Sequence, residues 1–437
     1  MLSEKLRYCA YWCLDSLKGK PVKKHLDEIT KIMEDSSLVK EHQEKQFKKI
    51  LTYAADNVEF YKNYDKNSKL SDLPVITKQT LKDNYEKFQS PEFTESDVVV
   101  MSTSGSTGTP FKMWQDRNKR NRVFAEMMYF WGTAGYKIGM KYVFFRVWTN
   151  KNKKSKLSAF ARNLIMKDIV SLDKENLESI RCMLKKNKKI KMILGYASTL
   201  ENLANYLLEC NDTPDMFKIK TVISGSEVLT EDTREKLKKV FGCLVVSFYS
   251  NQENGTLAIE CVDNKEFHVN DASYIIELLK PDCDEPVEPG EEGRVVVTDL
   301  YNRAMPVIRY DTGDMAVSKK EAECKWKSNV FASISGRRDD MLYATDGTPI
   351  SSHTFGVYMW QYNKLKQYQF IQNGEKEYII KLNGADMYSD DELTDFFKGV
   401  LGNDATIEIR RVDGIPVLAS GKFKRTVCNY KGQAVTK

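Results

Sequence analysis

One segment, Thr221-Val-Ile-Ser-Gly-Ser-Glu-Val-Leu-Thr-Glu-Asp-Thr-Arg-Glu-Lys-Leu-Lys-Lys-Val-Phe-Gly-Cys-Leu-Val-Val-Ser-Phe248, predicts a strand, a helix and a second strand in succession. Its β-rich runs span 221–223 and 244–248, and the stretch over 231–241 between them reads as a helix. Strands that alternate with helices in this way are typical of a layered fold with a largely parallel sheet. The segment therefore predicts an α/β protein.

The same alternation of strands and helices precedes this segment, and a pattern of strands joined by tight turns follows it. Tyr274–Leu279 and Arg294–Thr298, with a turn at Glu288-Pro-Gly290 between them, indicate antiparallel strands. Residues 1–90 read as mostly helical. The upstream strands and helices are expected at 141–145, 177–184, 192–194 and 199–208.

A second domain is expected after Gly336-Arg-Arg-Asp-Asp340, where the pattern becomes a small α+β unit. We predict a large N-terminal layered α/β domain with an antiparallel β subdomain over residues 1–335. Residues 336–437 are expected to form a small mobile C-terminal domain. Its strands are expected near 368–372, 377–382 and 406–411, with a helix near 391–401.

Composition limits the classes of protein that the chain can be. It has 437 residues with 41% apolar content, and its net charge of +6 is far from a nucleic-acid-binding composition. We expect no membrane span and no secretory signal, because no run of about twenty apolar residues occurs and the start lacks an apolar core. The nine cysteines contain no CxxC pair, which favours reduced thiols. A cytoplasmic protein is expected.

The sequence allows two interpretations each for two lysine clusters and for the predicted first helix. Lys151–Lys156 and Lys185–Lys191 are either solvated surface or attract an anionic substrate, partner or membrane. The helix-like start either packs on its own domain or makes peripheral contact with a membrane. Its apolar residues are Leu2, Leu6, Cys9, Tyr11, Trp12, Cys13 and Leu17, beside Lys5, Arg7, Lys18 and Lys20.

A loop rich in glycine and hydroxyl residues, Met101-Ser-Thr-Ser-Gly-Ser-Thr-Gly-Thr-Pro110, lies between two predicted strands. Such a loop can wrap backbone N–H groups and hydroxyls around phosphate oxygens. It lacks the Gly-Lys-Ser/Thr of a P-loop, and a flexible surface hairpin is the alternative. The predicted phosphate ligands are Thr103, Ser104, Gly105, Ser106, Thr107 and Gly108.

Polar segments follow two strands of the predicted sheet, Ser224-Gly-Ser-Glu227 and Tyr249-Ser-Asn-Gln-Glu253. Ligands of open α/β sheets lie beyond the carboxyl ends of strands. Tyr249 could stack on a base, and Glu253 could hold Mg²⁺ between phosphates. Asp314, in Tyr310-Asp-Thr-Gly-Asp314, could accept hydrogen bonds from two ribose hydroxyls.

These segments, in this order, resemble the adenylate-forming superfamily of acyl- and aryl-CoA synthetases, luciferases and nonribosomal adenylation domains. Within it, the resemblance is to the phenylacetate–coenzyme A ligase family and its CapK-like relatives encoded with capsular polysaccharide genes. It rests on Thr103–Pro110, Tyr249–Glu253, Tyr310–Asp314, Gly336–Asp340 and Ser420-Gly-Lys-Phe-Lys-Arg425, and on Leu51–Val58 and Leu73-Pro-Val-Ile-Thr-Lys78.

The resemblance implies an enzyme that uses ATP and Mg²⁺ to turn a carboxylic acid into an acyl adenylate. Lys422 would be the catalytic lysine, because the family spacing favours it over Lys424. Arg337 would contact the ribose, and Asp339 would be the hinge. The C-terminal domain would close for adenylation and then rotate for transfer to a thiol or amine. Further residues expected to bind ATP or AMP are Ser226, Glu227, Tyr249, Ser250, Gln252 and Asp314.

The sequence departs from the family at two places. Tyr249–Glu253 lacks the motif glycine and has Gln252 where relatives have Thr or Ser. Cys261, His268 and Cys324 match three family zinc ligands, while Ala322 stands at the fourth, and zinc usually takes four. Bound zinc is therefore not expected.

Three functions remain open for the chain. The first is activation of an acid and its transfer to coenzyme A or an amine such as an amino sugar or amino acid, in surface polysaccharide synthesis. The others are an acyl- or aryl-CoA ligase of catabolism and a noncatalytic nucleotide-binding scaffold, which Glu253, Asp314, Arg337 and Lys422 together argue against. The acid is not identified. Its pocket is expected to involve Arg146, Trp148, Tyr196, Ser224 and Gly225.

Overall fold

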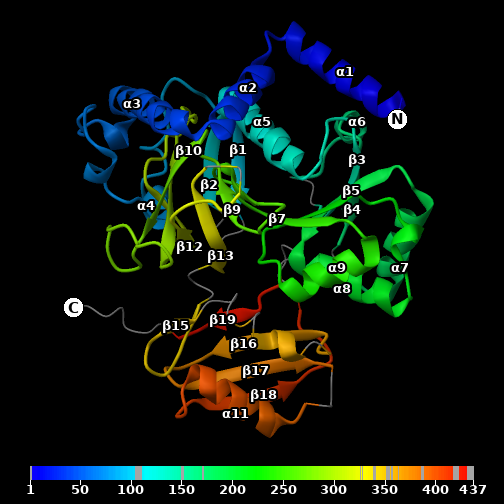
Figure 1. Ribbon diagram of the computed structural model, residues 1–437. Coiled ribbons are helices and arrows are strands. Elements are labelled where there is room, and N and C mark those ends of the chain that lie inside the picture. Colours follow the sequence, from blue (N-terminus) through cyan, green and yellow to red (C-terminus); the bar gives the residue numbers. More distant parts are fainter. Residues whose placement is uncertain are drawn as a thin grey trace.

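The chain folds into an N-terminal group of helices, a large mixed sheet with its covering helices, and a small C-terminal unit (Figure 1). This architecture confirms the predicted α/β class. The computed structural model describes residues 2–103, 111–148, 152–169, 172–324, 326, 328–337, 341–350, 355, 358–362, 364–384, 388–416 and 423–430.

The first ninety residues are mostly helical, as predicted, and they pack in two places. Apolar residues of α2, such as Ile29 and Ile32, pack against Ala125 and Phe130 of α5. The last turns of α3, with Leu51 and Ala54, pack into a second cluster. The helices are α1 (Leu2–Leu17), α2 (Pro21–Glu34), α3 (Val39–Asn57), α4 (Lys78–Asp83) and, later in the chain, α5 (Arg117–Thr133).

A separate antiparallel hairpin precedes α5. Its strands, β1 (Val98–Thr103) and β2 (Phe111–Asp116), pair in register from Val98↔Asp116 to Thr103↔Phe111. Asp116 accepts a hydrogen bond from the backbone N–H of Lys119 and so caps α5. The predicted phosphate loop connects these strands, and its residues 104–110 lie outside the described residues.

Within the described residues, the main sheet has eleven strands. They are β3 (Lys141–Arg146), β4 (Leu164–Asp168), β5 (Ile190–Tyr196), β6 (Thr221–Gly225), β7 (Leu244–Asn251), β8 (Gly255–Glu260), β9 (Phe267–Val269), β10 (Tyr274–Leu279), β11 (Glu292–Asp299), β12 (Tyr310–Lys319) and β13 (Val330–Arg337). Their order is β10-β11-β12-β13-β9-β8-β7-β6-β5-β3-β4.

The sheet is parallel in one half and antiparallel in the other. Strands β7, β6, β5, β3 and β4 pair in parallel, and from β8 to β10 the pairing is antiparallel. The antiparallel strands predicted from the sequence thus continue the parallel sheet. Among the described residues of this half, turns such as that around Gly290 (φ +94) connect the strands, and no helix lies between them.

The segment over 221–248 folds into β6, helix α9 and β7, as predicted. Thr230 caps α9 by accepting from the N–H of Thr233, and Gly242 ends it in the left-handed conformation (φ 59). Leu237, Val240 and Phe241 are buried against the sheet. The helices of this half are α6 (Lys156–Ala161), α7 (Lys174–Lys186), α8 (Ala197–Glu209) and α9 (Glu231–Phe241).

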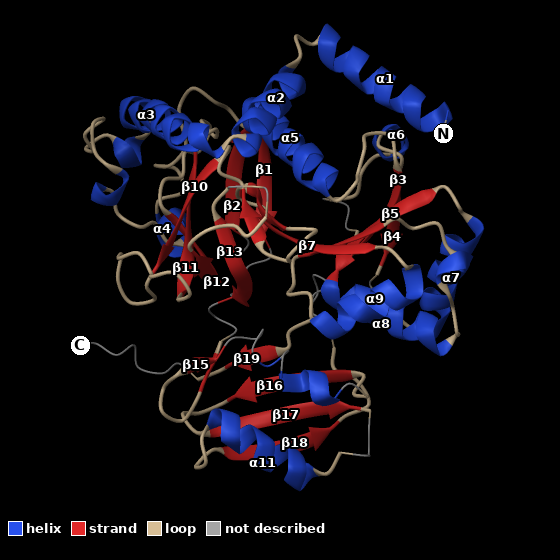
Figure 2. Cartoon of the chain, viewed as in Figure 1, coloured by secondary structure: helices blue, strands red, loops and turns tan. Residues whose placement is uncertain are grey.

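The C-terminal unit contains a four-stranded sheet, among the residues described, in the order β18-β17-β16-β19, with one helix packed on it (Figure 2). Phe370, Ile380 and Phe397 lie in its separate apolar core. The strands and helix are β14 (Leu342–Tyr343), β15 (Pro349–Ile350), β16 (Gln367–Gln372), β17 (Glu377–Asn383), α11 (Asp390–Leu401), β18 (Thr406–Arg411) and β19 (Thr426–Cys428). The boundary predicted at 335–340 falls at the end of β13.

Candidate functional site

The predicted site segments meet at one edge of the parallel half of the sheet. Arg146, Tyr196 and Gly225 are the last residues of β3, β5 and β6, and Tyr196 lies opposite Gly225 in the register. Gly225 in turn lies opposite Phe248 of β7, one residue before Tyr249. The carboxyl ends of these strands therefore bring the predicted residues to the place where α/β sheets bind ligands.

Tyr249, Asp314 and Arg337 form a cluster at this edge. The Tyr249 hydroxyl donates to Asp314 Oδ2 at 2.7 Å, and Arg337 Nε lies 3.0 Å from Asp314 Oδ1. Arg337 also donates to the carbonyl of Thr312 at 3.2 Å. Gly313 allows the chain to turn here with φ +76, a conformation that favours glycine. The cluster fixes a carboxylate and a guanidinium where the sequence predicts a ribose.

Burial and charge set the protonation of this cluster. Burial, followed by the charge of Asp314, raises the pKa of Tyr249 well above its usual value, so the phenol stays a donor. The Asp314 carboxylate raises the pKa of Arg337. Tyr249 is only 9% exposed. Its hydroxyl donates to Asp314, a contact that the sequence did not indicate, and the stacking of its ring on a base stays a prediction.

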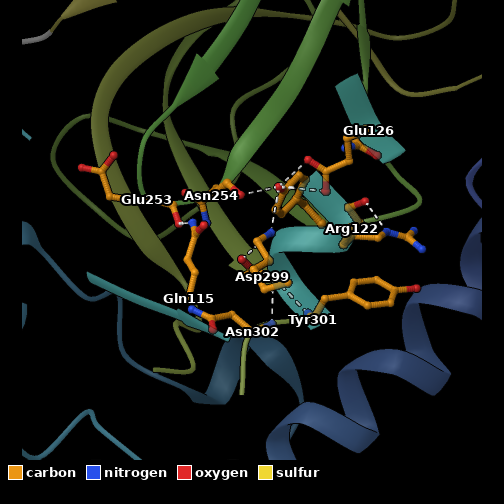
Figure 3. A network of polar contacts seen from close by, with 12 residues as sticks. Gln115, Arg122, Glu126, Glu253, Asn254, Asp299, Tyr301 and Asn302 are labelled. Atoms are coloured by element: carbon orange, nitrogen blue, oxygen red, sulfur yellow. Dashed lines mark hydrogen bonds and ion pairs between the residues drawn. The ribbon is translucent and has the colours of Figure 1, made fainter. Parts of the chain in front are cut away.

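Glu253 is 4% exposed. The loop that carries it is fixed by side chains that donate hydrogen bonds to its backbone carbonyls. Gln115 Nε2 donates to the Glu253 carbonyl at 2.7 Å and lies 3.3 Å from that of Gln252. The Tyr274 hydroxyl donates to the carbonyl of Asn254 at 2.9 Å. Figure 3 shows the Glu253 carboxylate directed away from these contacts. Gln115 lies on β2, in the hairpin that carries the predicted phosphate loop. Its side chain therefore joins this hairpin to the backbone of Glu253, the predicted Mg²⁺ ligand.

A buried ionic network supports this loop (Figure 3). Lys119 pairs with Asp299 at 2.7 Å and lies 2.9 Å from the Tyr274 hydroxyl. Tyr274 is 3.1 Å from both oxygens of Glu126, whose pKa is raised by burial. Each of these side chains is nearly inaccessible to water. Buried charges persist only when paired, so the network makes the floor of the site rigid.

Lys78 is a candidate site residue that the sequence did not single out. Burial lowers its pKa, as do the nearby charges of Arg337 and Lys82, while the carboxylates of Glu253 and Asp314 raise it. Ile76, two residues earlier, pairs with the start of β12, because it donates to the Arg309 carbonyl at 2.7 Å and accepts from the N–H of Asp311 at 2.9 Å. In the sequence, the segment Leu73–Lys78 only supported the family resemblance, and no role at the site was predicted for it. Its proximity to the site depends on the pairing of Ile76 with β12.

The C-terminal unit contacts the site through Glu227. One carboxylate oxygen of Glu227 accepts from the backbone N–H of Phe423 at 2.8 Å, and the other from that of Ser198 at 2.7 Å. Arg425 pairs with Glu201 of α8 at 2.5 Å. Ser226, next to Glu227, has a left-handed backbone (φ 68), which is uncommon for a residue with a side chain. These contacts bring the segment after Lys422 to the edge where the other predicted residues lie.

The residues predicted for the acid pocket surround the ends of β3 and β5. Tyr196 is 8% exposed, and burial raises its pKa. The Arg146 guanidinium lies 5.9 Å from the centre of the Trp148 ring, and the backbone N–H of Trp148 donates to Asp168 Oδ2 at 3.2 Å. A Cβ on Gly225 would lie 2.3 Å from the Phe248 ring, so this position has room only for glycine. Ser224 is fully buried behind it.

Ser250 lies in β7, next to Tyr249. Other predicted site residues are described only in part or not at all. Thr103 ends β1, but its side chain is not described. The residues that lie outside the described part of the chain are Ser104, Gly105, Ser106, Thr107, Gly108, Asp339 and Lys422.

Cys261, His268 and Cys324 come together away from this edge. Their possible ligand atoms all lie within 4.8 Å of one another, with His268 Nε2 3.1 Å from Cys324 Sγ. His268 Nδ1 lies 2.8 Å from the Ser328 hydroxyl, a contact that leaves Nε2 facing the thiols. Burial lowers the pKa of His268 to about 4, so the ring is neutral near pH 7. The three donors suit zinc, and Ala322 supplies no fourth.

We expect protein purified without chelator to contain well below one zinc ion per chain, because three protein donors hold zinc less firmly than four. Elemental analysis of the metal content checks this. A Cys261→Ser variant is the control, and its zinc content should equal that of the native protein. The expectation would be contradicted if the native protein held one zinc ion per chain and the variant held none. The fourth ligand position would then be assigned to water.

Known proteins resemble the chain in sequence. Residues 342–429 match the family described as the CapK C-terminal domain. The chain is 25% identical to Protein CapK of Staphylococcus aureus, over 95% of this chain and 94% of that protein. It is 28% identical to phenylacetate-coenzyme A ligase of Thermus thermophilus, over 69% of this chain and 70% of that ligase.

Solved structures share the fold. The TM-score is 0.72 against 2-hydroxyisobutyryl-CoA ligase in the postadenylation state in complex with R3-HIB-AMP, at 16% identity and coverage of 90% and 89%. Against the same ligase with 2-HIB-AMP and CoA in the thioesterification state the TM-score is 0.59, at 16% identity and coverage of 91% and 90%.

The chain has the fold of the adenylate-forming CoA ligases. Its similarity to the phenylacetate-coenzyme A ligases and to the CapK C-terminal domain confirms the resemblance expected from the sequence. In sequence the chain is similar to the phenylacetate–coenzyme A ligases, and over nearly its whole length to Protein CapK.

Proposed function

We propose that the protein activates a carboxylic acid with ATP and transfers the acyl group to an acceptor. A carboxylate oxygen attacks the α-phosphorus of ATP, the bond to the β-phosphate oxygen breaks, and pyrophosphate leaves. A thiol or amine then attacks the acyl carbon, loses its proton, and displaces AMP. The observation that carries the proposal is the cluster of Tyr249, Asp314 and Arg337 beside Glu253.

Each described residue has a role in this proposal. Asp314 accepts hydrogen bonds from the ribose hydroxyls, Tyr249 and Arg337 hold it in place, and Glu253 would be the ligand of Mg²⁺. Bound Mg²⁺ would neutralise charge on the phosphates. Lys78 adds a cation beside the same carboxylates, and burial lowers its pKa. Ser250 and Gln252 are proposed to contact phosphate or nucleotide, as are Ser226 and Glu227.

The arrangement of the two proposed domains, 1–335 and 336–437, suits the adenylation step. Phe423 and Arg425 contact Glu227 and Glu201 of the larger part. The higher TM-score against the postadenylation state than against the thioesterification state of one ligase agrees with this. Lys422 precedes Phe423 and is therefore proposed to reach the α-phosphate here. Rotation about Asp339 would then move the C-terminal domain for transfer.

Coenzyme A and an amine are both proposed as acceptors. The phenylacetate-coenzyme A ligase relatives favour coenzyme A, and hence a CoA ligase of catabolism as the second candidate. Similarity to Protein CapK over nearly the full length supports a role in surface polysaccharide synthesis. All nine cysteines are free thiols, which suits the reducing cytoplasm, the proposed location.

Pyrophosphate release tests the first half-reaction. With MgATP and a panel of aliphatic, aromatic, amino and sugar acids, we expect release above the acid-free rate for at least one class. Its exchange with labelled ATP should need the acid but no acceptor. Adding coenzyme A or an amino sugar to the active mixture then distinguishes the acceptors by the mass of the product. ATP binding without turnover on any acid would favour the noncatalytic scaffold.

A further inference from the structure

Helix α1 carries an apolar stripe that points away from the rest of the protein. Leu6, Leu14 and Leu17 are 63%, 58% and 84% exposed, and Ala10 and Cys13 between them are also exposed. The spacing follows the 3.6-residue period of a helix, so these side chains lie along one face. Figure 1 shows α1 on the outside of the molecule. An ordered row of exposed leucines is unusual for a soluble surface.

The opposite face of α1 is fixed on the protein, which sets the direction of the stripe. Tyr11 packs against Phe124 of α5, with ring centroids 5.6 Å apart. Asp15 is 6% exposed and accepts from the backbone N–H groups of Val22 and Lys23 at 3.1 and 3.0 Å. Asp15 thus caps α2 and ties the two helices together. Helix α1 therefore already has its intramolecular partner, and the leucines remain uncovered.

Helix α6 extends the exposed apolar area beside the start of α1. The Arg7 guanidinium of α1 lies 4.2 Å from the centre of the Phe160 ring. Phe160 is 67% exposed, and Leu157, one turn earlier, is 77% exposed. Two elements that are distant in sequence therefore both present large apolar side chains to water at this end of the molecule.

This apolar area is strongly cationic at its borders. Residues 2–28 contain six lysines and arginines against four carboxylates, of which Asp15 is buried, Asp27 pairs with Lys23 and Glu28 pairs with Arg122 of α5. Described residues 152–162 contain Lys153, Lys154, Lys156 and Arg162 and no carboxylate. Lysines beside an exposed amphipathic helix are typical of surfaces that bind anionic lipid headgroups.

We propose that α1 and α6 dock this protein on a bilayer that contains anionic lipids. The leucines of α1, with Leu157 and Phe160, would enter the boundary between headgroups and acyl chains, and the lysines would contact the phosphates. A second copy is a poor occupant, because a two-fold interface would place these cationic borders against each other. Within the described residues, no helix is long and apolar enough to cross a membrane.

Vesicle sedimentation with the full chain tests this proposal without acid or ATP, so its result is independent of the proposed function. Vesicles are made of phosphatidylcholine alone or of equal parts phosphatidylcholine and phosphatidylglycerol. We expect binding only to the anionic vesicles, weakened by added salt because headgroup attraction is screened. Equal binding to both vesicles, or binding to neither, would overturn the proposal.

Two variants separate the apolar and the charged contributions. Leu14→Glu/Leu17→Glu and Lys5→Ala/Lys18→Ala should each weaken binding about tenfold or more. Their matched controls alter exposed residues elsewhere, Val262→Glu for the leucines and Lys238→Ala/Lys239→Ala for the lysines, and should bind as the native chain does.

Thermal unfolding followed by circular dichroism should show that all variants keep their fold, since the substituted residues are exposed. Native binding by the leucine variant would overturn the proposal. So would a native dimer, found by light scattering, that the leucine variant converts to monomer, because the stripe would then bind a second copy.

Discussion

Lys422→Ala is expected to reduce acid-dependent pyrophosphate release by about 100- to 1000-fold, the loss of about 3–4 kcal/mol of barrier stabilisation typical of one electrostatic donor. Negative charge shifts onto the phosphoryl oxygens as pyrophosphate leaves, and we propose that this lysine stabilises it. The N–H of Phe423, the next residue, donates to Glu227 beside the proposed nucleotide site. ATP binding and the melting temperature should change little.

Lys424→Ala is the matched control for this variant. Lys424 lies two residues further along the same segment, and its carbonyl accepts from Gln369 Nε2 at 2.9 Å. That bond involves the backbone, so it survives the substitution. We expect near-native pyrophosphate release from Lys424→Ala. Full activity of Lys422→Ala, or the reverse ranking of the two variants, would show that the family spacing does not identify the lysine.

Arg425→Gln is expected to slow pyrophosphate release by about 30- to 100-fold, from the loss of about 2–3 kcal/mol when a mostly buried ion pair loses one partner. Arg425 and Glu201 are 10% and 20% exposed and join the two proposed domains at 2.5 Å. With Arg425 gone, the Glu201 carboxylate would stay unpaired in the closed arrangement but reach water after rotation. Transfer from a preformed acyl adenylate should therefore proceed at the native rate.

The double variant Glu201→Gln/Arg425→Gln distinguishes this conformational effect from a general loss of structure. Neither charge remains to be desolvated, so adenylation should recover most of the loss. The rates of the two half-reactions are measured separately for each variant. If both half-reactions fall together in Arg425→Gln, or if the double variant is slower still, Arg425 does not act by holding the domains closed.

Most of the fold was predictable, because its elements are marked by local patterns. The alternation over 221–248 predicts β6, α9 and β7, and Thr230 and Gly242 end the helix where such residues favour caps. The small α+β unit after residue 340 also appears in the sequence as separate periodic runs. The continuation of the parallel sheet by antiparallel strands was not predictable, since it depends on the order in which distant strands pair.

The candidate site was predictable as a set of segments, but its contacts were not. Strand ends placed Tyr249 and Glu253 at one edge, while the hydrogen bond from Tyr249 to Asp314 joins residues 65 apart in sequence. Likewise, nothing local to Lys78 shows that Ile76 pairs with β12. The convergence of Cys261, His268 and Cys324 was visible only through family resemblance. Long-range pairing is what the sequence patterns leave out.

The pairing of Ile76 with β12 has a consequence for shortening the chain. Ile76 donates to Arg309, and Asp311 donates back to Ile76, so the segment forms part of the framework of the proposed nucleotide site. Leu51 and Ala54 of α3 lie in the same buried cluster as Leu73 and Ile76, so α3 and this segment together support the position of Lys78. A truncation that begins at β1 would expose β12 and remove a cation from the proposed nucleotide site. Minimal versions of this enzyme should begin upstream of α3, whatever becomes of α1.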